Sequence, residues 1–237
     1  LGLLFLEILI VHSKNEQQKN ASNQVQTARI MANGDLLYHD GLYMSALQAD
    51  GSYDFTENFT YVKPWLKQAD LVLGDFEGTI NPDYPLSGYP LFNAPQSVTA
   101  VISDAGYDVM DLAHNHILDS GLEGAFTTAD AFKEVGIDPV GVYENPVRDK
   151  APLFIKNVNG IKVAILSYAY GFNGLESNLT EKEIANHLSN LDEKRMKVEI
   201  ERAEKEADVT VIMPQMGVEY RLEPTDEQVK LYHKMID

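Results

Sequence analysis

The chain has no cysteine among its 237 residues and only one tryptophan. The absence of cysteine excludes disulfide frameworks, thiol nucleophiles and cysteine-ligated metals, but it does not assign a compartment. Basic side chains are also scarce, because 19 Lys and Arg stand against 36 Asp and Glu, which gives a formal net charge of −17. Such an acidic protein repels polyanions, and this argues against nucleic acid and anionic lipid surfaces as partners.

Two common enzyme signatures are missing as well. The chain has no Gly-x-Ser-x-Gly elbow and no glycine-rich phosphate loop that ends in Gly-Lys-Ser/Thr, so serine-hydrolase, P-loop and Rossmann interpretations are disfavoured. With 44% hydrophobic and 23% charged residues, the composition is that of a globular protein. A folded chain of this length buries roughly 70% of its extended surface and needs no disulfide or zinc to hold it together.

The amino-terminal segment is apolar apart from Glu7. Its 11 residues, 1–11, are fewer than the roughly 20 that a membrane-spanning helix needs. The residues from His12 to Thr27 are polar and rich in Asn, Gln, Ser and Lys, which is linker composition. We therefore predict a remnant of a membrane anchor or signal segment at 1–12 and a polar linker at 13–27. The alternative is a short amphipathic helix packed on the core.

From Ala28 onward, short apolar runs alternate with helical patterns. Strands are predicted at 28–32, 70–74, 107–113, 139–143, 161–168 and 208–213. Helices are predicted within 55–67, from an N-cap at Asn93 to Ala105 with Gly106 as its terminating glycine, at 122–135, and after capping boxes that begin at Thr180, Ser189 and Thr225. This alternation predicts an α/β fold with largely parallel strand pairing. The chain shows no internal repeat and no shift of composition after residue 28, which indicates one domain at 28–237.

Polar side chains follow the carboxyl ends of the predicted strands. They are Asp35, His39, Asp75, Glu77, His114, Asn115, His116, Asp119, Gln215 and Glu219. Ligands of α/β proteins bind at this edge of the sheet, where the loops converge. A set of Asp, Glu, Asn and His without cysteine suits Mn, Mg, Zn or Fe. The sequence therefore predicts a metal-centred site at the strand ends.

Each of these elements also has a structural interpretation. Gly-Asp after a strand is common turn chemistry, so Asp35 and the segment Gly74–Gly78 are compatible with solvated turns. The run His114-Asn115-His116 is the strongest signal. Even there, one of two such histidines usually packs in the core or only orients the other.

Four motifs occur in an order and spacing that resemble a known family. They are Asn33-Gly-Asp35 with His39, Leu73-Gly-Asp-Phe-Glu77-Gly, Asp111-Leu-Ala-His-Asn-His116 with Asp119 and Gly121, and Gly217-Val-Glu-Tyr220. Together they resemble the CapA capsule-synthesis family, whose members act in the production of poly-γ-glutamate capsules. The resemblance runs from about Ala28 to the end of the chain, and the segment from Asn115 to Gly121 is its most specific part.

The CapA family is similar to calcineurin-like metallophosphatases, which implies a four-layer α/β/β/α sandwich with a metal site at the strand ends. The resemblance implies a divalent metal (Mn, Zn, Fe or Mg) held by Asp35, His39, Asp75, Glu77, Asn115 and His116. It also implies catalytic roles for His114 and His116, supported by Asp119, Gln215 and Glu219, with His114 either an acid or a residue that orients a neighbour. A bound divalent ion would assist hydrolysis or group transfer.

The sequence departs from the family pattern in three ways. Family members often have histidine where Gln215 stands, and Asp75 replaces their usual asparagine. The later Gly-His-x-Pro-His-type motif of the family does not occur before Asp237. We therefore expect the metallophosphatase-like domain to be incomplete at its C-terminus, without some of its ligands and sheet strands.

The resemblance leaves the function open between two main hypotheses. The first is an extracellular, membrane-anchored protein of poly-γ-glutamate-type capsule biosynthesis with a metal-dependent hydrolase-like site. The second is a non-catalytic accessory subunit of a capsule polymer synthesis and export complex. Gram-positive members are typically held outside the cell by an N-terminal anchor, which matches residues 1–27. The implied partners are membrane-bound synthase and export subunits and an anionic polymer, which the charge of −17 would repel unless cations bridge the two. A third hypothesis, a cytosolic phosphoesterase, applies if the N-terminal segment is a packed helix.

Overall fold

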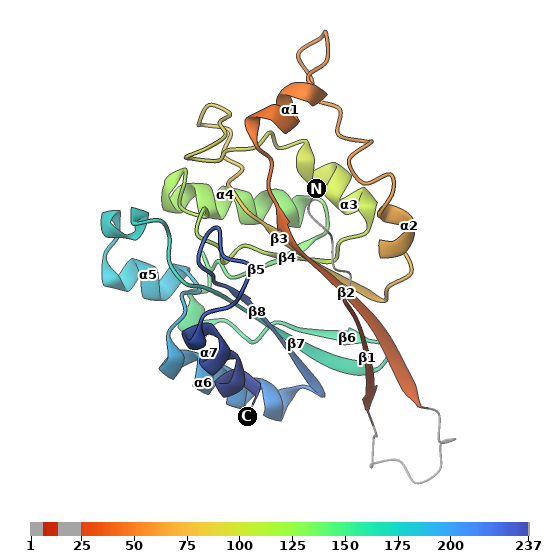
Figure 1. Cartoon of the computed structure of the whole chain (residues 1–237), viewed down its shortest axis with the longest axis vertical. Coiled ribbons are helices and arrows are strands. Elements are labelled where there is room, and N and C mark those ends of the chain that lie inside the picture. The colour runs from red at the N-terminus through yellow and green to blue at the C-terminus, as the bar shows by residue number, and fades with distance from the viewer. Residues whose placement is uncertain (1–6, 14–24, 237) are drawn as a thin grey trace.

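The computed structural model describes the backbone of residues 7–13 and all atoms of residues 25–236. Within these residues the strands are β1 (Glu7–Ser13), β2 (Gln26–Leu36), β3 (Leu71–Phe76), β4 (Val109–Asp111), β5 (Asp138–Val140), β6 (Ile155–Val158), β7 (Ile161–Ala169) and β8 (Val209–Gln215). The helices are α1 (Asp40–Ala46), α2 (Lys63–Leu66), α3 (Val98–Ala105), α4 (Gly121–Glu134), α5 (Glu181–His187), α6 (Glu193–Glu206) and α7 (Asp226–Ile236), with 3-10 turns η1 (Arg148–Lys150) and η2 (Leu175–Asn178). Figure 1 shows their arrangement.

The strands form two sheets. The first has the order β1-β2-β3-β4-β5, in which β2 to β5 run parallel and β1 is antiparallel to β2. The second has the order β6-β7-β8, with β7 and β8 parallel and β6 antiparallel to β7. The predicted α/β class with largely parallel pairing is therefore confirmed.

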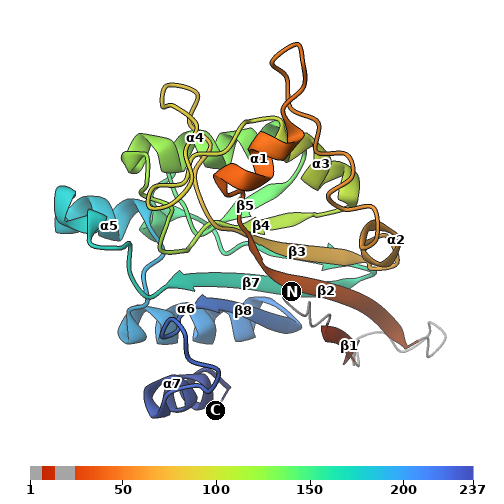
Figure 2. The ribbon, with the colours of Figure 1, turned by 45° about the horizontal axis from the view of Figure 1, so that its top comes forward.

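Three apolar clusters hold the sheets and helices together. Between the two sheets, side chains from β2, β3, β4 and β5 meet side chains from β6 and β7. On the other face of the first sheet lie α3 and α4, and on the other face of the second sheet lies α6. Figure 2 shows this order of helices, sheet, sheet and helices from top to bottom. Both faces of the first sheet are covered, so polar ligands can reach it only at the strand ends.

The central strand β3 shows why this sequence makes a buried strand. All six of its residues are buried, as expected for a parallel strand covered on both faces. Within it, a Cβ atom at Gly74 would lie 2.8 Å from the ring of Tyr107. Only glycine at that position lets the tyrosine ring pack directly on the strand, and this packing fixes β3 where its acidic end residues emerge.

An irregularity in β2 sets the register at the site. The pairing of β2 with β3 shifts between Ala32 and Asp35, as happens at a β-bulge. After the shift, Asp35 pairs with Asp75, and Asp75 pairs in turn with Asp111 of β4. Cross-strand partners at one register share a face of the sheet. The three aspartates therefore form a row across three adjacent strands.

Several local predictions are confirmed by side-chain contacts. Thr180 and Glu183 form the predicted capping box at the start of α5. Thr225 and Gln228 form a second one ahead of α7, with N···O distances of 2.8 and 3.2 Å. Gly106 ends α3 in the left-handed region, at φ 109°, where glycine is favoured.

Two predicted N-caps are wrong. Asn93 does not cap α3, because its side-chain amide bonds backbone groups of the loop that precedes it, including both N–H and C=O of Asn81. Ser189 does not cap α6, because its hydroxyl donates to the Ser167 carbonyl. Asp192 caps that helix instead and accepts from two backbone N–H groups. In both cases a tertiary hydrogen bond has replaced the local one.

Other boundaries differ as well. The helix predicted within 55–67 is limited to α2, with Pro64 in its first turn. The antiparallel strand β6 was not predicted at all. Short elements of this kind depend on neighbours in the fold rather than on their own sequence pattern.

At the amino terminus, residues 7–13 form β1 along β2, whereas the alternative interpretation had expected a helix. Gln26 and Thr27, at the end of the predicted linker, belong to β2. Residues 1–6 and 14–24 lie outside the described residues, so the anchor and the rest of the linker stay predictions. In the part of the chain that the structure describes, no helix has both the length and the apolar character that a bilayer crossing requires.

Candidate metal centre

The row of Asp35, Asp75 and Asp111 lies at the carboxyl ends of β2, β3 and β4. Asp75 and Asp111 are buried, at 8% and 2% exposed, and Asp35 is exposed. Glu77 follows β3 by one residue, and its side chain is 14% exposed. Four carboxylates from three neighbouring strands therefore lie at one edge of the sheet, and their burial increases from Asp35 to Asp111.

The negative charge of these four carboxylates is not balanced by the positive charge of the neighbouring side chains. Burial raises the pKa of Asp75 well above its usual range, and the charges of Asp111, Asp35 and Glu77 add to the effect. Burial and the charge of Asp35 raise the pKa of Glu77 to about 7, although His116 opposes the shift. One buried carboxylate oxygen of Asp75 has no hydrogen-bond partner among the described residues. A cation would relieve both the repulsion and this unpaired oxygen.

Asp111 forms the buried end of the row. Burial raises its pKa to about 7, although hydrogen bonds from the Ser167 hydroxyl and the Ala113 N–H lower it. Ser167 lies on β7, so this contact joins the second sheet to the site. The carboxylate is thus held in place from both sheets.

His116 stands beside the carboxylates. Its Nδ1 lies 2.7 Å from Asp119 Oδ2, and its Nε2 lies 4.0 Å from Glu77 Oε1. Burial lowers the pKa of His116, but the hydrogen bond and charge of Asp119, with Glu77 and Glu219, raise it overall. A carboxylate on one imidazole nitrogen is the usual arrangement of a metal-ligating histidine. Nε2 is then the nitrogen left for a ligand.

Asn115 is held by amide contacts from the second sheet. Gln215, the last residue of β8, donates from Nε2 to Asn115 Oδ1 over 3.0 Å. Asn115 Nδ2 donates in turn to Asn173 Oδ1 over 3.2 Å. The Gln215 amide oxygen, Oε1, is buried without a partner among the described residues. Gln215 therefore stands next to the predicted ligand Asn115.

The other two predicted histidines lie differently. His114 is fully buried and accepts the His116 N–H at its Nδ1 over 3.1 Å. Burial, followed by the charge of His116, lowers its pKa to about 3, so its imidazole is neutral. This placement favours an orienting role for His114 over that of an acid. His39 pairs with its neighbour Asp40. Its ring lies edge-on to the Phe92 ring, with 5.5 Å between the ring centroids.

The structure therefore does not bring His39 into contact with the carboxylate row in the described residues. Phe92 contacts both histidines, because its ring also packs edge-on against His116, with 4.7 Å between the ring centroids. The Phe92 backbone N–H donates to Asp119 Oδ2 over 2.6 Å. The residue thus fixes both His116 and the carboxylate that orients it.

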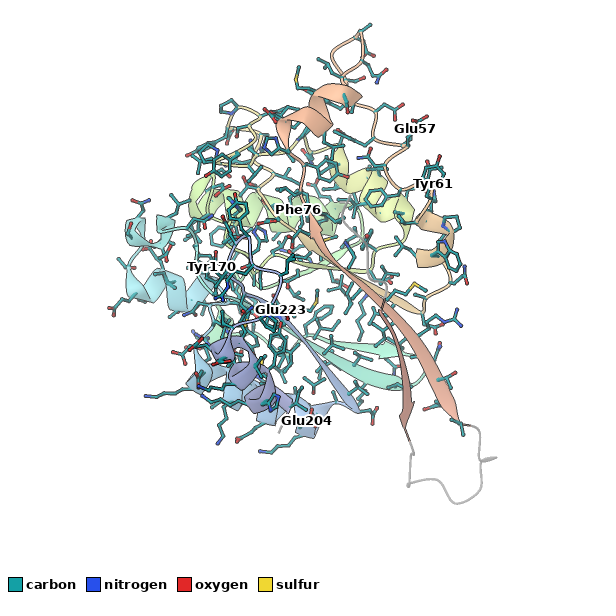
Figure 3. All side chains as sticks on the ribbon, in the orientation of Figure 1. Glu57, Tyr61, Phe76, Tyr170, Glu204 and Glu223 are labelled. Carbon is teal, nitrogen blue, oxygen red and sulfur yellow. The ribbon has the colours of Figure 1, made fainter. Side chains whose placement is uncertain are left out.

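Glu219 and Tyr170 border the site. Glu219 is exposed, and its charge raises the pKa of both His116 and Tyr170, which places it near them. Burial is the first cause of the Tyr170 shift, and Glu77 and Glu176 contribute to it as well. Figure 3 labels Tyr170, which follows β7 directly, and Phe76, the last residue of β3. Loops of both sheets therefore frame the carboxylates.

Four residues of this site were missed by the sequence analysis as site residues: Asp111, Ser167, Phe92 and Asn173. Asp111 belongs to a motif already noted in the sequence, Asp111-Leu-Ala-His-Asn-His116, but the strand predicted there ran on to residue 113, past the actual end of β4. The other three reach the site from distant segments, and no local pattern marks them.

The described residues fit a divalent cation by their chemistry. Carboxylate and amide oxygens with one imidazole suit the metals named above. No three His, Asp or Glu side chains in residues 25–236 already converge in an arrangement that could hold a metal ion. Binding would therefore require some of these side chains to rotate toward the ion.

Comparison with known proteins gives a consistent family. The model of the family described as "Bacterial capsule synthesis protein PGA_cap" matches residues 29–237. A capsule biosynthesis protein CapA of Bacillus anthracis is 31% identical in an alignment of 188 positions that covers 76% of this chain and 45% of that protein. A PGA biosynthesis protein CapA of Bacillus subtilis (strain 168) is 26% identical in an alignment of 239 positions that covers 99% of this chain and 60% of that protein. The chain thus spans about half the length of these curated relatives.

Proposed function

The chain belongs to the PGA_cap family of bacterial capsule synthesis proteins, and from this membership we propose that it acts in the biosynthesis of a poly-γ-glutamate-type capsule through a metal-dependent hydrolase-like site. The observation that carries the proposal is the row of Asp35, Asp75 and Asp111, with Glu77 and His116 beside it. The relatives named for capsule and PGA biosynthesis support the biological setting.

In this proposal the ion is held by Asp35, Asp75, Glu77, the Asn115 amide oxygen and His116 Nε2. A divalent ion bound there supplies Lewis acidity for hydrolysis or group transfer. The chain's own contribution is to position these donors. Asp119 fixes the His116 ring, and the buried carboxylates give the site a charge that only a cation satisfies.

The net charge makes a cation useful for the substrate as well. A protein of charge −17 repels a polyanion such as a glutamate polymer. A divalent ion at the strand ends would offset part of the carboxylate charge and offer coordination positions of its own, so an anionic chain could bind there through the ion.

We also propose an extracellular, membrane-anchored location with membrane-bound synthase and export subunits as partners. The apolar composition of residues 1–11 supports an anchor, whereas the pairing of Glu7–Ser13 with β2 also gives part of this segment a place in the sheet. Recovery of the native protein from the soluble intracellular fraction would count against this location.

Metal uptake tests the proposed site directly. Replacing Glu77 by glutamine removes a ligand charge but keeps the side-chain shape, so we expect Mn²⁺ or Zn²⁺ affinity to fall by about tenfold or more. Isothermal titration of metal-free protein measures this affinity. The matched control is Asp130→Asn, an exposed acid on α4 whose partner is the exposed Lys133, and it should leave the affinity unchanged. Absence of metal uptake by the parent protein, or equal affinities in both variants, would contradict the proposal.

One observation favours a second function, that of a non-catalytic accessory subunit. The Gln215 amide takes up one of the two acceptor positions of the Asn115 oxygen that would otherwise both be free for an ion. A fold retained as a scaffold would tolerate this contact. If the site is catalytic, the double variant Asn115→Ala/His116→Ala should abolish capsule polymer output from cells that still display the protein. Unchanged output with normal display would favour the accessory role.

A further inference from the structure

We propose that Asn173 is a positioning residue of this site, which clamps the predicted ligands Asn115 and His116 from the loop after β7. The inference rests on the proposed function, because it concerns how the chain holds those two side chains for an ion. Asn173 itself is exposed, whereas Asn115 and His116 beneath it are buried, at 6% and 9% exposed. Core packing therefore does not explain its contacts.

The oxygen end of the Asn173 amide holds Asn115. Asn173 Oδ1 accepts from Asn115 Nδ2 over 3.2 Å, while Asn115 Oδ1 accepts from Gln215 Nε2 over 3.0 Å. The three amides are aligned in one direction, since each donates through its nitrogen to the oxygen of the next. This alignment fixes which end of the Asn115 amide is the oxygen, and a ligand must present that end.

The nitrogen end of the Asn173 amide holds the His116 ring. Asn173 Nδ2 lies 3.4 Å from both Nδ1 and Nε2 of that ring. An in-plane position equidistant from the two nitrogens would collide with the carbon between them, so the amide lies over the ring face. The in-plane direction of Nδ1 belongs to Asp119, at 2.7 Å. The in-plane direction of Nε2 is left open toward Glu77, at 4.0 Å.

The backbone explains why asparagine stands at this position. Asn173 has φ 54° and is followed by Gly174 at φ 81°. Asparagine is among the few residues other than glycine that adopt the left-handed region at low cost. Glycine would fit the turn but offers no amide, and aspartate would fit less well as a clamp because it cannot donate to the ring. The site thus uses one residue type for the turn and for both contacts.

The test compares three variants in the full chain. Asn173→Gly keeps the left-handed turn and removes the amide, and Asn173→Asp keeps an acceptor for Asn115 but loses the donor over His116. Asn159→Gly is the matched control, because Asn159 is also exposed, also has φ 54°, and its side chain contacts the Thr27 carbonyl and Asp70 rather than the site. Side-chain NMR signals of Asn115 and His116 are recorded without metal, and Mn²⁺ affinity is measured by titration.

We expect Asn173→Gly to shift the Asn115 amide and His116 ring signals and to weaken Mn²⁺ binding by about 10–100-fold, as for other residues that orient ligands. Asn173→Asp should shift the His116 signals more than those of Asn115, and the control should change neither. Signals in Asn173→Gly that match the control would overturn the clamp, and shifted signals with parental Mn²⁺ affinity would overturn its role toward the ion. If the parent binds no metal, the proposed function fails, while the metal-free spectra still decide whether Asn173 positions the two side chains.

Discussion

Replacement of Arg148 by methionine is expected to lower the free energy of unfolding by about 3 kcal/mol. The Arg148 side chain is only 1% exposed, and its Nη2 lies 2.9 Å from Glu199 Oε2. Its Nη1 donates to the Leu188 carbonyl over 3.0 Å. The guanidinium also lies over the rings of Tyr143 and Tyr168, at 5.9 and 5.7 Å. Methionine fills the space but leaves a buried carbonyl and a partly buried carboxylate without their main donor.

The size of this loss of stability depends on the contacts that Glu199 keeps when Arg148 is replaced. Glu199 keeps a hydrogen bond from the Tyr168 hydroxyl and a contact with Arg195, so we place the loss at the lower end of the range for a broken buried pair. Urea denaturation measures it. The control is Arg202→Met, which breaks an exposed i,i+4 pair with Glu206 and should cost less than about 1 kcal/mol. Equal losses in the two variants would show that burial of Arg148 adds nothing.

The Arg148 cluster illustrates what sequence alone cannot supply. Arg148 lies on η1, and its partners Glu199 and Leu188 follow 51 and 40 residues later. No pattern of spacing or composition links such positions, since an arginine in a polar segment is usually solvated. Only the docking of α6 on the second sheet brings the pair together.

Features set by neighbours in the sequence were predicted well. The capping box at Thr180 and the glycine end of α3 depend on residues within one turn of the helix. The strand at 161–168 is strongly apolar apart from Lys162 and Ser167, and all but one residue of β7 is buried. The failures at Asn93 and Ser189 share one cause. Short polar side chains can cap a helix or bond any other backbone group within reach. Here both side chains bond backbone groups that are distant in the sequence.

The residues of the candidate site also divide into those that the sequence predicts and those that only the fold brings together. Asp75 and Glu77 could be placed beforehand, because they follow a strongly apolar strand. Asp111 was not assigned, because the predicted strand continued to residue 113, whereas β4 ends at Asp111 itself. The order of the strands then makes it a neighbour of Asp75, and this order is a property of the whole fold. Asn173 reaches His116 across 57 residues, and only the second sheet puts it there.

Replacement of Gly141 by alanine is expected to destabilise the chain by about 3 kcal/mol and to disturb the metal centre. Gly141 has φ 96°, and a Cβ there would lie 2.7 Å from the Ala113 backbone nitrogen and 2.8 Å from its Cβ. Ala113 precedes His114, and its N–H donates to Asp111 Oδ1 over 2.8 Å. The backbone cannot yield without moving this hydrogen bond and the loop that carries Asn115. We therefore expect weaker Mn²⁺ binding together with the lower stability.

A second glycine separates the steric effect from the backbone effect. Gly136, after α4, has φ 82°, and a Cβ added there would meet no atom within 4 Å, so Gly136→Ala should cost only the left-handed conformation, about 1 kcal/mol. Urea denaturation and Mn²⁺ titration of both variants make the comparison. Any additional loss of stability in Gly141→Ala then comes from the close contact between the ends of β4 and β5. The same contact keeps Asp111, the buried end of the carboxylate row, in place. Equal stability losses in the two variants, or unchanged Mn²⁺ affinity in Gly141→Ala, would refute this link between strand packing and the site.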